Sequence, residues 1–164
     1  CANHSSGWDP VLLVCALASD FPLRIMAKEQ LFKIPIIGGF IRRMGAFPVD
    51  RGNSDIGAVK TSIKSLKDGF SLLIFPEGTR EKEGKLLPPK SGLFVIAAKA
   101  EVDVVPCRIF YDTPDGKMHL FCRVRVIYGE PMPAAQFAME SRRDTKKLRA
   151  NKQALLEAWE KMGA

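Results

Sequence analysis

The sequence predicts an α/β fold: a mixed, mostly parallel sheet covered by helices. Apolar runs of strand length alternate with helical stretches along the chain, which is typical of this class. The strand-length runs are apolar throughout, as expected for strands that are covered on both faces. The 164 residues, 46% of them hydrophobic, contain no repeat and no Gly/Ser-rich linker. They are interpreted as one domain spanning residues 1–164.

The first half of the chain is expected to begin with a buried helix, for which Asp9 is the predicted N-cap and Pro10 the first helical residue. The elements predicted after it are a strand at 23–28, apolar helical pieces at 29–34 and 35–44, a strand at 45–51 and a helix at 53–69. The last helix is expected to be capped by Asn53 or Ser54 and to end at Gly69. Its predicted apolar stripe consists of Ile56, Val59, Ile63 and Leu66.

The second half continues the alternation of strands and helices. The predicted elements are a strand at 70–75, a helix at 91–100, strands at 102–111 and 118–130 joined by a turn, and a helix from about 142 to 162. The last helix is amphipathic, with Leu148, Leu155, Trp159 and Met162 on one side. Basic residues near its start suit either contact with anionic headgroups or a solvated face: Arg142, Arg143, Lys146, Lys147, Arg149 and Lys152.

Composition limits the partners and the compartment. A net charge of +7 favours an anionic partner: nucleic acid, a phosphorylated metabolite or anionic lipid. The four cysteines form no CxxC pair and are expected to be reduced, mostly buried and cytoplasmic. Two histidines make a His-rich metal site unexpected, and no apolar run approaches the ~20 residues of a membrane span. The chain starts without Met, and an upstream segment is expected to be missing.

Polar residues cluster in "NHSSGWD", "GAFPVDR" and "FPEGTR", where apolar elements give way to loops. In the first, Asp9 could orient His4 so that the imidazole accepts a proton from a hydroxyl. The alternative is that Asp9 only caps its helix and His4 lies on the surface; a carboxylate with two oxygens could also do both. Ser5 and Ser6 are interpreted as turn residues rather than as nucleophiles.

The other two stretches each carry an arginine beside an acidic residue. Arg51 and Arg80 could bind phosphate, because a guanidinium donates to two oxygens at once, or they could pair with Asp50 and Glu77. Gly78 permits a close approach of the backbone to a ligand. Glu77 could act as an acid–base group, organise a phosphate site or be a buried structural carboxylate.

Taken together, these stretches resemble the glycerolipid acyltransferase family, the 1-acylglycerol-3-phosphate acyltransferases of phosphatidic acid synthesis. The family's NHxxxxD block is matched by Asn3, His4 and Asp9, and its FPEGTR block in full by residues 75–80. Its Gly-x-x-Phe-x-Asp-Arg block is resembled by residues 45–51, and a "VPV" strand is approximated around Pro106. The blocks occur in the family's order, from Asn3 to about residue 130.

The resemblance implies transfer of an acyl group from acyl-CoA or acyl carrier protein to the free hydroxyl of 1-acylglycerol-3-phosphate. His4 would be the general base and Asp9 its support, without a covalent acyl-enzyme, a metal or a cofactor. Arg51 and Arg80 would hold the acceptor's phosphate, with Glu77 and Gly78 shaping that loop. The alternatives are the same chemistry on glycerol 3-phosphate or another lysolipid, or a lipid-binding homologue with little turnover.

The resemblance also implies the cytoplasmic face of a membrane as the location, with attachment either peripheral or through a segment absent from this chain. An anionic membrane surface is the expected partner and nucleic acid is not, since no aromatic platform or recognition motif is present. The apolar stretch at residues 35–44 could line an acyl-chain groove, touch the bilayer or pack as ordinary core.

Overall fold

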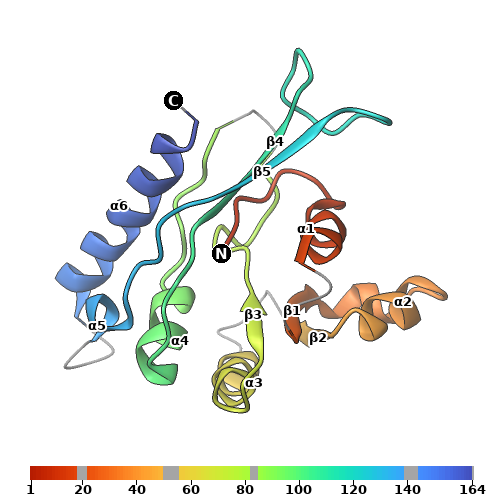
Figure 1. Cartoon of the computed structure of the whole chain (residues 1–164). Helices are drawn as coiled ribbons and strands as arrows, with labels where there is room; N and C mark the ends of the chain where they lie inside the picture. Colours follow the sequence, from red (N-terminus) through yellow and green to blue (C-terminus); the bar gives the residue numbers. More distant parts are fainter. Residues whose placement is uncertain (18–21, 50–55, 82–84, 139–143, 164) are drawn as a thin grey trace. The chain divides into compact units, whose positions relative to one another are not determined.

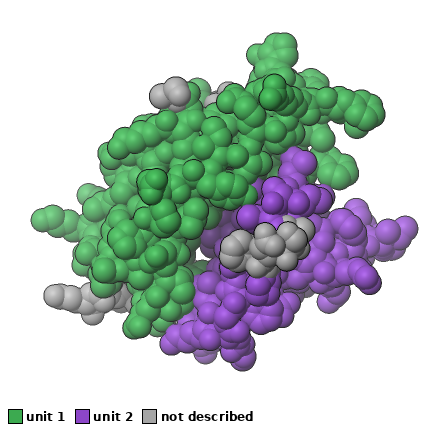
Figure 2. Space-filling view, in the orientation of Figure 1, with its two compact units in different colours: residues 1–9, 75–164 green, residues 10–74 purple. Residues whose placement is uncertain are grey.

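The computed structural model describes residues 1–17, 22–49, 56–81, 85–138 and 144–163, and it confirms the α/β class (Figure 1). The chain divides into two compact units, one made of residues 1–9 and 75–164 and the other of residues 10–74 (Figure 2). The first residues of the chain therefore belong with its second half. Whether residues 1–164 act as one domain stays a prediction.

The unit of residues 10–74 contains a three-stranded parallel sheet in the order β2-β1-β3. The strands are β1 (Leu23–Lys28), β2 (Ala46–Val49) and β3 (Ser71–Leu73). All three were predicted, although β3 is shorter than the apolar run at 70–75. In the register, Ile25 lies opposite Ala46 on one side and Leu73 on the other.

A glycine determines how β2 enters this sheet. Gly45 has φ +82°, and a Cβ on it would lie 2.3 Å from the carbonyl oxygen of Leu23 in β1. Only glycine combines this left-handed backbone with so close an approach to the neighbouring strand.

The helices of this unit are α1 (Asp9–Leu17), η1 (Glu29–Lys33, a 3-10 helix), α2 (Ile37–Arg43) and α3 (Ile56–Lys67). The predicted stripe of α3 is wrong in part, because Ala58 and Ser62 are its buried residues and Ile56 is 61% exposed. Small side chains allow a helix to approach its neighbours closely, and the Ser62 hydroxyl is satisfied by donating to the Ala58 carbonyl at 2.7 Å. The predicted caps Asn53 and Ser54 lie outside the described residues.

The other unit contains β4 (Cys107–Tyr111) and β5 (Val124–Tyr128), which pair antiparallel with Ile109 opposite Val126. Its helices are α4 (Gly92–Ala100), α5 (Ala134–Phe137) and α6 (Thr145–Lys161). The core of the unit is built around large side chains that are fully buried: Phe94, Phe137, Leu155 and Trp159.

Helix α6 uses its apolar side for this core, since Leu155 and Trp159 both lie on it and neither is exposed. The Asp144 side chain caps the helix by accepting from the Lys147 amide at 3.0 Å. These two apolar side chains are therefore occupied within the protein, and whether the basic residues of α6 contact anionic headgroups or form a solvated face stays a prediction. Arg142 and Arg143 lie outside the described residues.

All four cysteines are free, but only Cys107 is buried and Cys15 is exposed, so the expectation of mostly buried thiols is wrong. In the part of the chain that the structure describes, no helix has the length and apolar composition to cross a bilayer.

Candidate active site

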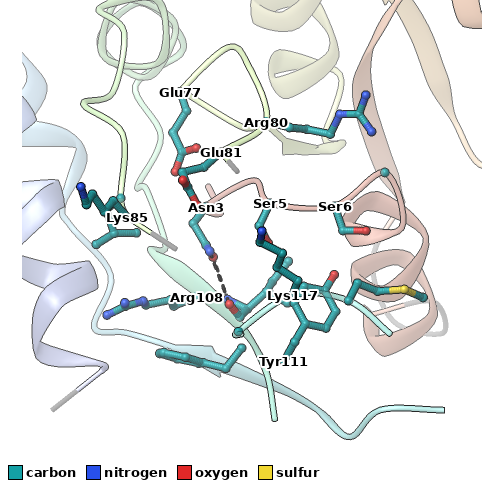
Figure 3. Close-up of a pocket in the computed structure, with 16 residues that line it drawn as sticks. Asn3, Ser5, Ser6, Glu77, Arg80, Glu81, Lys85, Arg108, Tyr111 and Lys117 are labelled. Carbon is teal, nitrogen blue, oxygen red and sulfur yellow. Dashed lines mark hydrogen bonds between the residues drawn. The ribbon is translucent and has the colours of Figure 1, made fainter. Parts of the chain in front are cut away.

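The first residues of the chain run along the edge of β4. Ala2 forms a parallel bridge with Cys107. The Asn3 side chain accepts from the Ile109 amide at 2.7 Å and donates to the Ile109 carbonyl at 3.4 Å (Figure 3). A primary amide can satisfy both backbone groups of a strand residue, since it carries a donor and an acceptor. Asn3 thereby fixes the position from which His4 starts.

His4 and Asp9 form a buried pair. The ring Nδ1 lies 2.9 Å from Asp9 Oδ2, and the two residues are 6% and 0% exposed. The Phe75 ring stacks on the imidazole with the centroids 4.3 Å apart. Because a carboxylate oxygen only accepts, this contact assigns the proton to Nδ1 and leaves Nε2 with a lone pair. The imidazole is held as the tautomer that a general base requires.

Asp9 is itself held by several donors. The amides of Ser5 and Ser6 each donate to Oδ2 at 2.8 Å, and the Tyr111 hydroxyl donates to Oδ1. Among the described residues, the backbone amides that donate to the Asp9 side chain both come before Asp9 in the chain. The prediction that Asp9 caps the helix that follows it is therefore wrong. The Ser6 hydroxyl accepts from the Trp8 amide at 3.2 Å, in agreement with its interpretation as a turn residue.

Tyr111 was missed by the sequence reasoning. Burial alternates along β4, with Cys107, Ile109 and Tyr111 on the buried side. A tyrosine on the buried side of a strand needs a partner for its hydroxyl, and this requirement was the available signal. Burial and the contact with Asp9 both raise the pKa of Tyr111, so the hydroxyl remains a donor.

Glu77 lies in the loop that follows β3 and belongs to the same unit as His4. Its side chain is buried, and neither carboxylate oxygen has a hydrogen-bond partner within the described residues. Burial raises the pKa of Glu77 to about 7; the nearby amides of His4 and Leu87 offset part of this effect, and the Glu81 and Asp9 carboxylates add to it. The group is therefore poised to exchange a proton near neutral pH.

The loop around Glu77 is tightly turned and attached to the first block. Gly78 has φ +72°, and a Cβ on it would lie 2.6 Å from Lys90 Nζ. The Gly78 amide closes a turn on the Phe75 carbonyl at 3.1 Å. The Glu81 amide donates to the His4 carbonyl at 2.8 Å. The two sequence blocks are thus joined directly at the backbone.

Arg80 extends from this loop toward the turn between His4 and Asp9. A Cβ on Gly7 would lie 3.4 Å from Arg80 Nη1. The Arg80 side chain is exposed and forms no ion pair with any residue that the structure describes. The alternative in which Arg80 pairs with Glu77 is therefore wrong. Asp50 and Arg51 lie outside the described residues.

A cavity of about 470 Å³ adjoins these groups (Figure 3). Asn3, Ser5, Glu77, Arg80 and Tyr111 belong to its lining, which is mixed polar and apolar. Lys85, Arg108 and Lys117 add positive charge. Arg108 also donates to the Trp159 carbonyl at 2.6 Å, which ties it to α6. The described part of the chain contains no cluster of His, Cys, Asp and Glu suited to a metal ion.

Residues 1–110 match the family model described as acyltransferase. The chain belongs to the acyltransferase family. The matched residues include His4, Asp9, Glu77 and Arg80, and the resemblance found in the sequence is confirmed. The family model covers β4 as far as Phe110, so Tyr111 lies directly after its end.

Several curated relatives of this chain are named 1-acyl-sn-glycerol-3-phosphate acyltransferase. The protein of Bacillus subtilis is 38% identical over 135 residues, which are 81% of this chain and 66% of the relative. That of Streptococcus pneumoniae is 37% identical over 80% of this chain and 48% of the relative. The crystal structure of the 1-acyl-sn-glycerophosphate acyltransferase of Thermotoga maritima has a TM-score of 0.65 and 29% identity, over 95% of this chain and 64% of that one. The chain thus spans two thirds or less of each of these proteins.

Proposed function

We propose that this chain transfers a fatty acyl group from a thioester, acyl-CoA or acyl carrier protein, to the free hydroxyl of 1-acylglycerol-3-phosphate, giving phosphatidic acid. The observation that carries the proposal is the buried His4–Asp9 pair, with Nδ1 fixed by the carboxylate and Nε2 left as an acceptor. The relatives' names support the choice of acceptor.

In the proposed reaction, Nε2 of His4 removes the proton of the acceptor hydroxyl as its oxygen attacks the thioester carbonyl. A tetrahedral intermediate forms, then its carbon–sulfur bond breaks, and the proton on the imidazolium passes to the leaving thiolate. Asp9 holds the ring in place and stabilises its positive charge. The acyl group moves directly between the two substrates, so no cofactor is required.

The acceptor's phosphate is proposed to bind Arg80, which is exposed next to the His4–Asp9 turn. Arg51 is proposed as a second ligand by resemblance. Glu77 and Gly78 shape the loop. Because the pKa of Glu77 is raised to about 7, its carboxyl group is partly protonated near neutral pH, which reduces its repulsion of the phosphate. Binding the phosphate positions the hydroxyl against His4, which lowers the entropic part of the barrier. The location proposed is the cytoplasmic face of a membrane.

The test is release of thiol from a long-chain acyl-CoA in detergent, with and without 1-acylglycerol-3-phosphate. His4→Ala should lower the acceptor-dependent rate by about 10²–10⁴-fold, the usual contribution of a general base. The matched control is His119→Ala, because His119 also contacts an aspartate, Asp115 at 3.0 Å, but on the exposed surface.

Four outcomes would contradict the proposal. Release that ignores the acceptor would exclude transfer to it, and unchanged release in His4→Ala would exclude His4 as the base. Faster release with glycerol 3-phosphate or another lysolipid would identify a different acceptor for the same chemistry. Binding of the acceptor without any release would support the lipid-binding alternative.

A further inference from the structure

Large apolar side chains are exposed along η1, α2 and the turn that joins them. They are Leu31, Ile34, Ile36, Ile37 and Phe40, called here the 31–40 face. The only buried residue of α2 is Gly38, which packs so closely on η1 that a Cβ on it would lie 2.4 Å from the Phe32 carbonyl oxygen. The interpretation of this stretch as ordinary core is therefore wrong for these side chains. Helix α2 is drawn in orange in Figure 1.

Ile36 is the most exposed residue of this face and lies in a strained turn. Its backbone has φ 67° and ψ −54°, and the Ile37 amide donates to the Pro35 carbonyl at 2.7 Å. This geometry is a γ-turn of the positive-φ kind, which is rare and unfavourable for a β-branched residue. The side chain is 90% exposed, so packing within the protein does not compensate for the strain. Strain of this kind points to a role outside the folded chain.

Basic side chains accompany the face. Lys33, Arg42 and Arg43 are exposed, and Glu29 pairs with Lys33 at 2.9 Å. The Arg42 guanidinium lies over the Phe32 ring at 5.0 Å. Residues 29–43 thus carry three positive charges and one negative charge. An apolar stripe accompanied by arginine and lysine is the arrangement that binds the interface of an anionic bilayer.

We infer that the 31–40 face docks on an anionic lipid surface, with Ile36, Ile37 and Phe40 inserted below the headgroups. A helix bound in this way lies in the plane of the interface, at a depth of roughly 5–10 Å. A second copy of the chain fits this face less well, because a two-fold contact would bring Arg42 and Arg43 of both copies together. The inference rests on the proposed function in that the acceptor is a membrane lipid.

The decisive variant is Ile36→Gly, tested by flotation of the chain with vesicles of phosphatidylglycerol and phosphatidylcholine. Glycine removes the inserted side chain and accepts the positive φ without strain. Vesicle affinity should fall by about tenfold, the effect of removing one large apolar side chain from a partly apolar environment. The melting temperature should hold or rise, which separates this loss from misfolding.

Ile56→Gly is the matched control, because Ile56 is an exposed isoleucine of the same unit that does not belong to the 31–40 face. It should lower the melting temperature, since glycine weakens a helix, and leave vesicle binding unchanged. Equal vesicle binding by Ile36→Gly and the unmodified chain would overturn the inference, as would equal losses in the two variants.

Charge is tested by the double variant Arg42→Gln/Arg43→Gln against Lys60→Gln/Lys67→Gln on α3. The arginine variant should lose roughly 30-fold in affinity for anionic vesicles, since each of the two basic residues contributes about 1 kcal/mol near such a surface. Its affinity for vesicles of phosphatidylcholine alone should equal that of the unmodified chain. An equal loss in the lysine variant would show a general effect of net charge and overturn the assignment to this face.

Turnover separates this inference from the proposed function. In detergent, Ile36→Gly should keep the rate of the unmodified chain, and with acceptor in anionic vesicles it should be slower. If the unmodified chain transfers no acyl group, the proposed function fails while flotation still decides the docking. If Ile36→Gly is slow in detergent but binds vesicles normally, the face lines an acyl-chain groove and docking is overturned. A dimer that Ile36→Gly dissociates, with vesicle binding unchanged, would assign the face to a second copy instead.

Discussion

Replacing Glu77 with glutamine should remove most of a pH dependence of folding stability that the wild-type protein shows between about pH 4.5 and 7. Glu77 is 3% exposed and its carboxylate oxygens have no hydrogen-bond partner among the described residues. Burial raises its pKa from 4.5 to about 7, so the folded protein keeps the proton over a range in which the unfolded chain has released it. A group with a raised folded pKa contributes its full stability below the unfolded value and loses that contribution as the pH rises through the folded value.

The size of the effect follows from the same shift. The difference between 7 and 4.5 is 2.5 pKa units. At 1.36 kcal/mol per unit this corresponds to about 3 kcal/mol. The wild-type protein should therefore lose about 3 kcal/mol of stability between pH 4.5 and pH 8 relative to Glu77→Gln. The change in slope is the expected result, because glutamine also alters packing by an amount that is the same at every pH.

Urea denaturation at half-unit steps of pH, followed by circular dichroism, measures this difference. Glu130→Gln is the control, because Glu130 is an exposed carboxylate in the same unit and should leave the slope of the wild-type protein unchanged. Parallel stability curves for the wild-type protein and Glu77→Gln would refute the reasoning. So would a gain of stability by the wild-type protein relative to the variant as the pH rises.

Two further substitutions test individual contacts. Tyr111→Phe should lower kcat by about tenfold, equivalent to ~1.4 kcal/mol, because one donor to Asp9 is lost. KM should change little, and Tyr128→Phe on the exposed side of β5 should keep the wild-type kcat; equal rates in both variants would exclude a positioning role for Tyr111. Gly45→Ala should cost about 3 kcal/mol in urea denaturation, from the positive φ and the clash with β1 together, and Gly69→Ala only about 1 kcal/mol. Gly69 has φ +87° and open space around its Cβ position, so equal losses would show that the clash is absent.

Much of the fold could be predicted because the relevant information is local. The strand at 23–28 was predicted with its observed bounds, and helix α4 with nearly the observed ones, since both are short apolar runs with clear ends. The buried residues of α3 could not be predicted, because its close packing selects Ala58 and Ser62 over the larger side chains. The exposure of Ile36 was also out of reach, since hydropathy alone assigns an apolar side chain to the interior as readily as to a surface.

The candidate site divides in the same way. His4 and Asp9 are five residues apart, and a short turn brings them into contact, so their pairing was within reach of the sequence. Tyr111 is 102 residues from Asp9, and its contribution depends on how β4 is placed. The sequence could not decide whether Arg80 pairs with Glu77, because an arginine that follows a glutamate in a loop can pair with it or point away from it.

The short spacing of His4 and Asp9 explains why they meet, but not why they are rigid. Rigidity comes from contacts with residues far along the chain. The Cys107 amide donates to the Cys1 carbonyl at 2.7 Å, and the Glu81 amide to the His4 carbonyl at 2.8 Å. The Asn3 side chain bonds both backbone groups of Ile109. A base whose ring must stay aligned through a proton transfer needs such external support, because five residues of isolated turn would sample many conformations. The local motif thus brings His4 and Asp9 into contact, and the hydrogen bonds of residues 1–3 with β4 hold the pair in a fixed position.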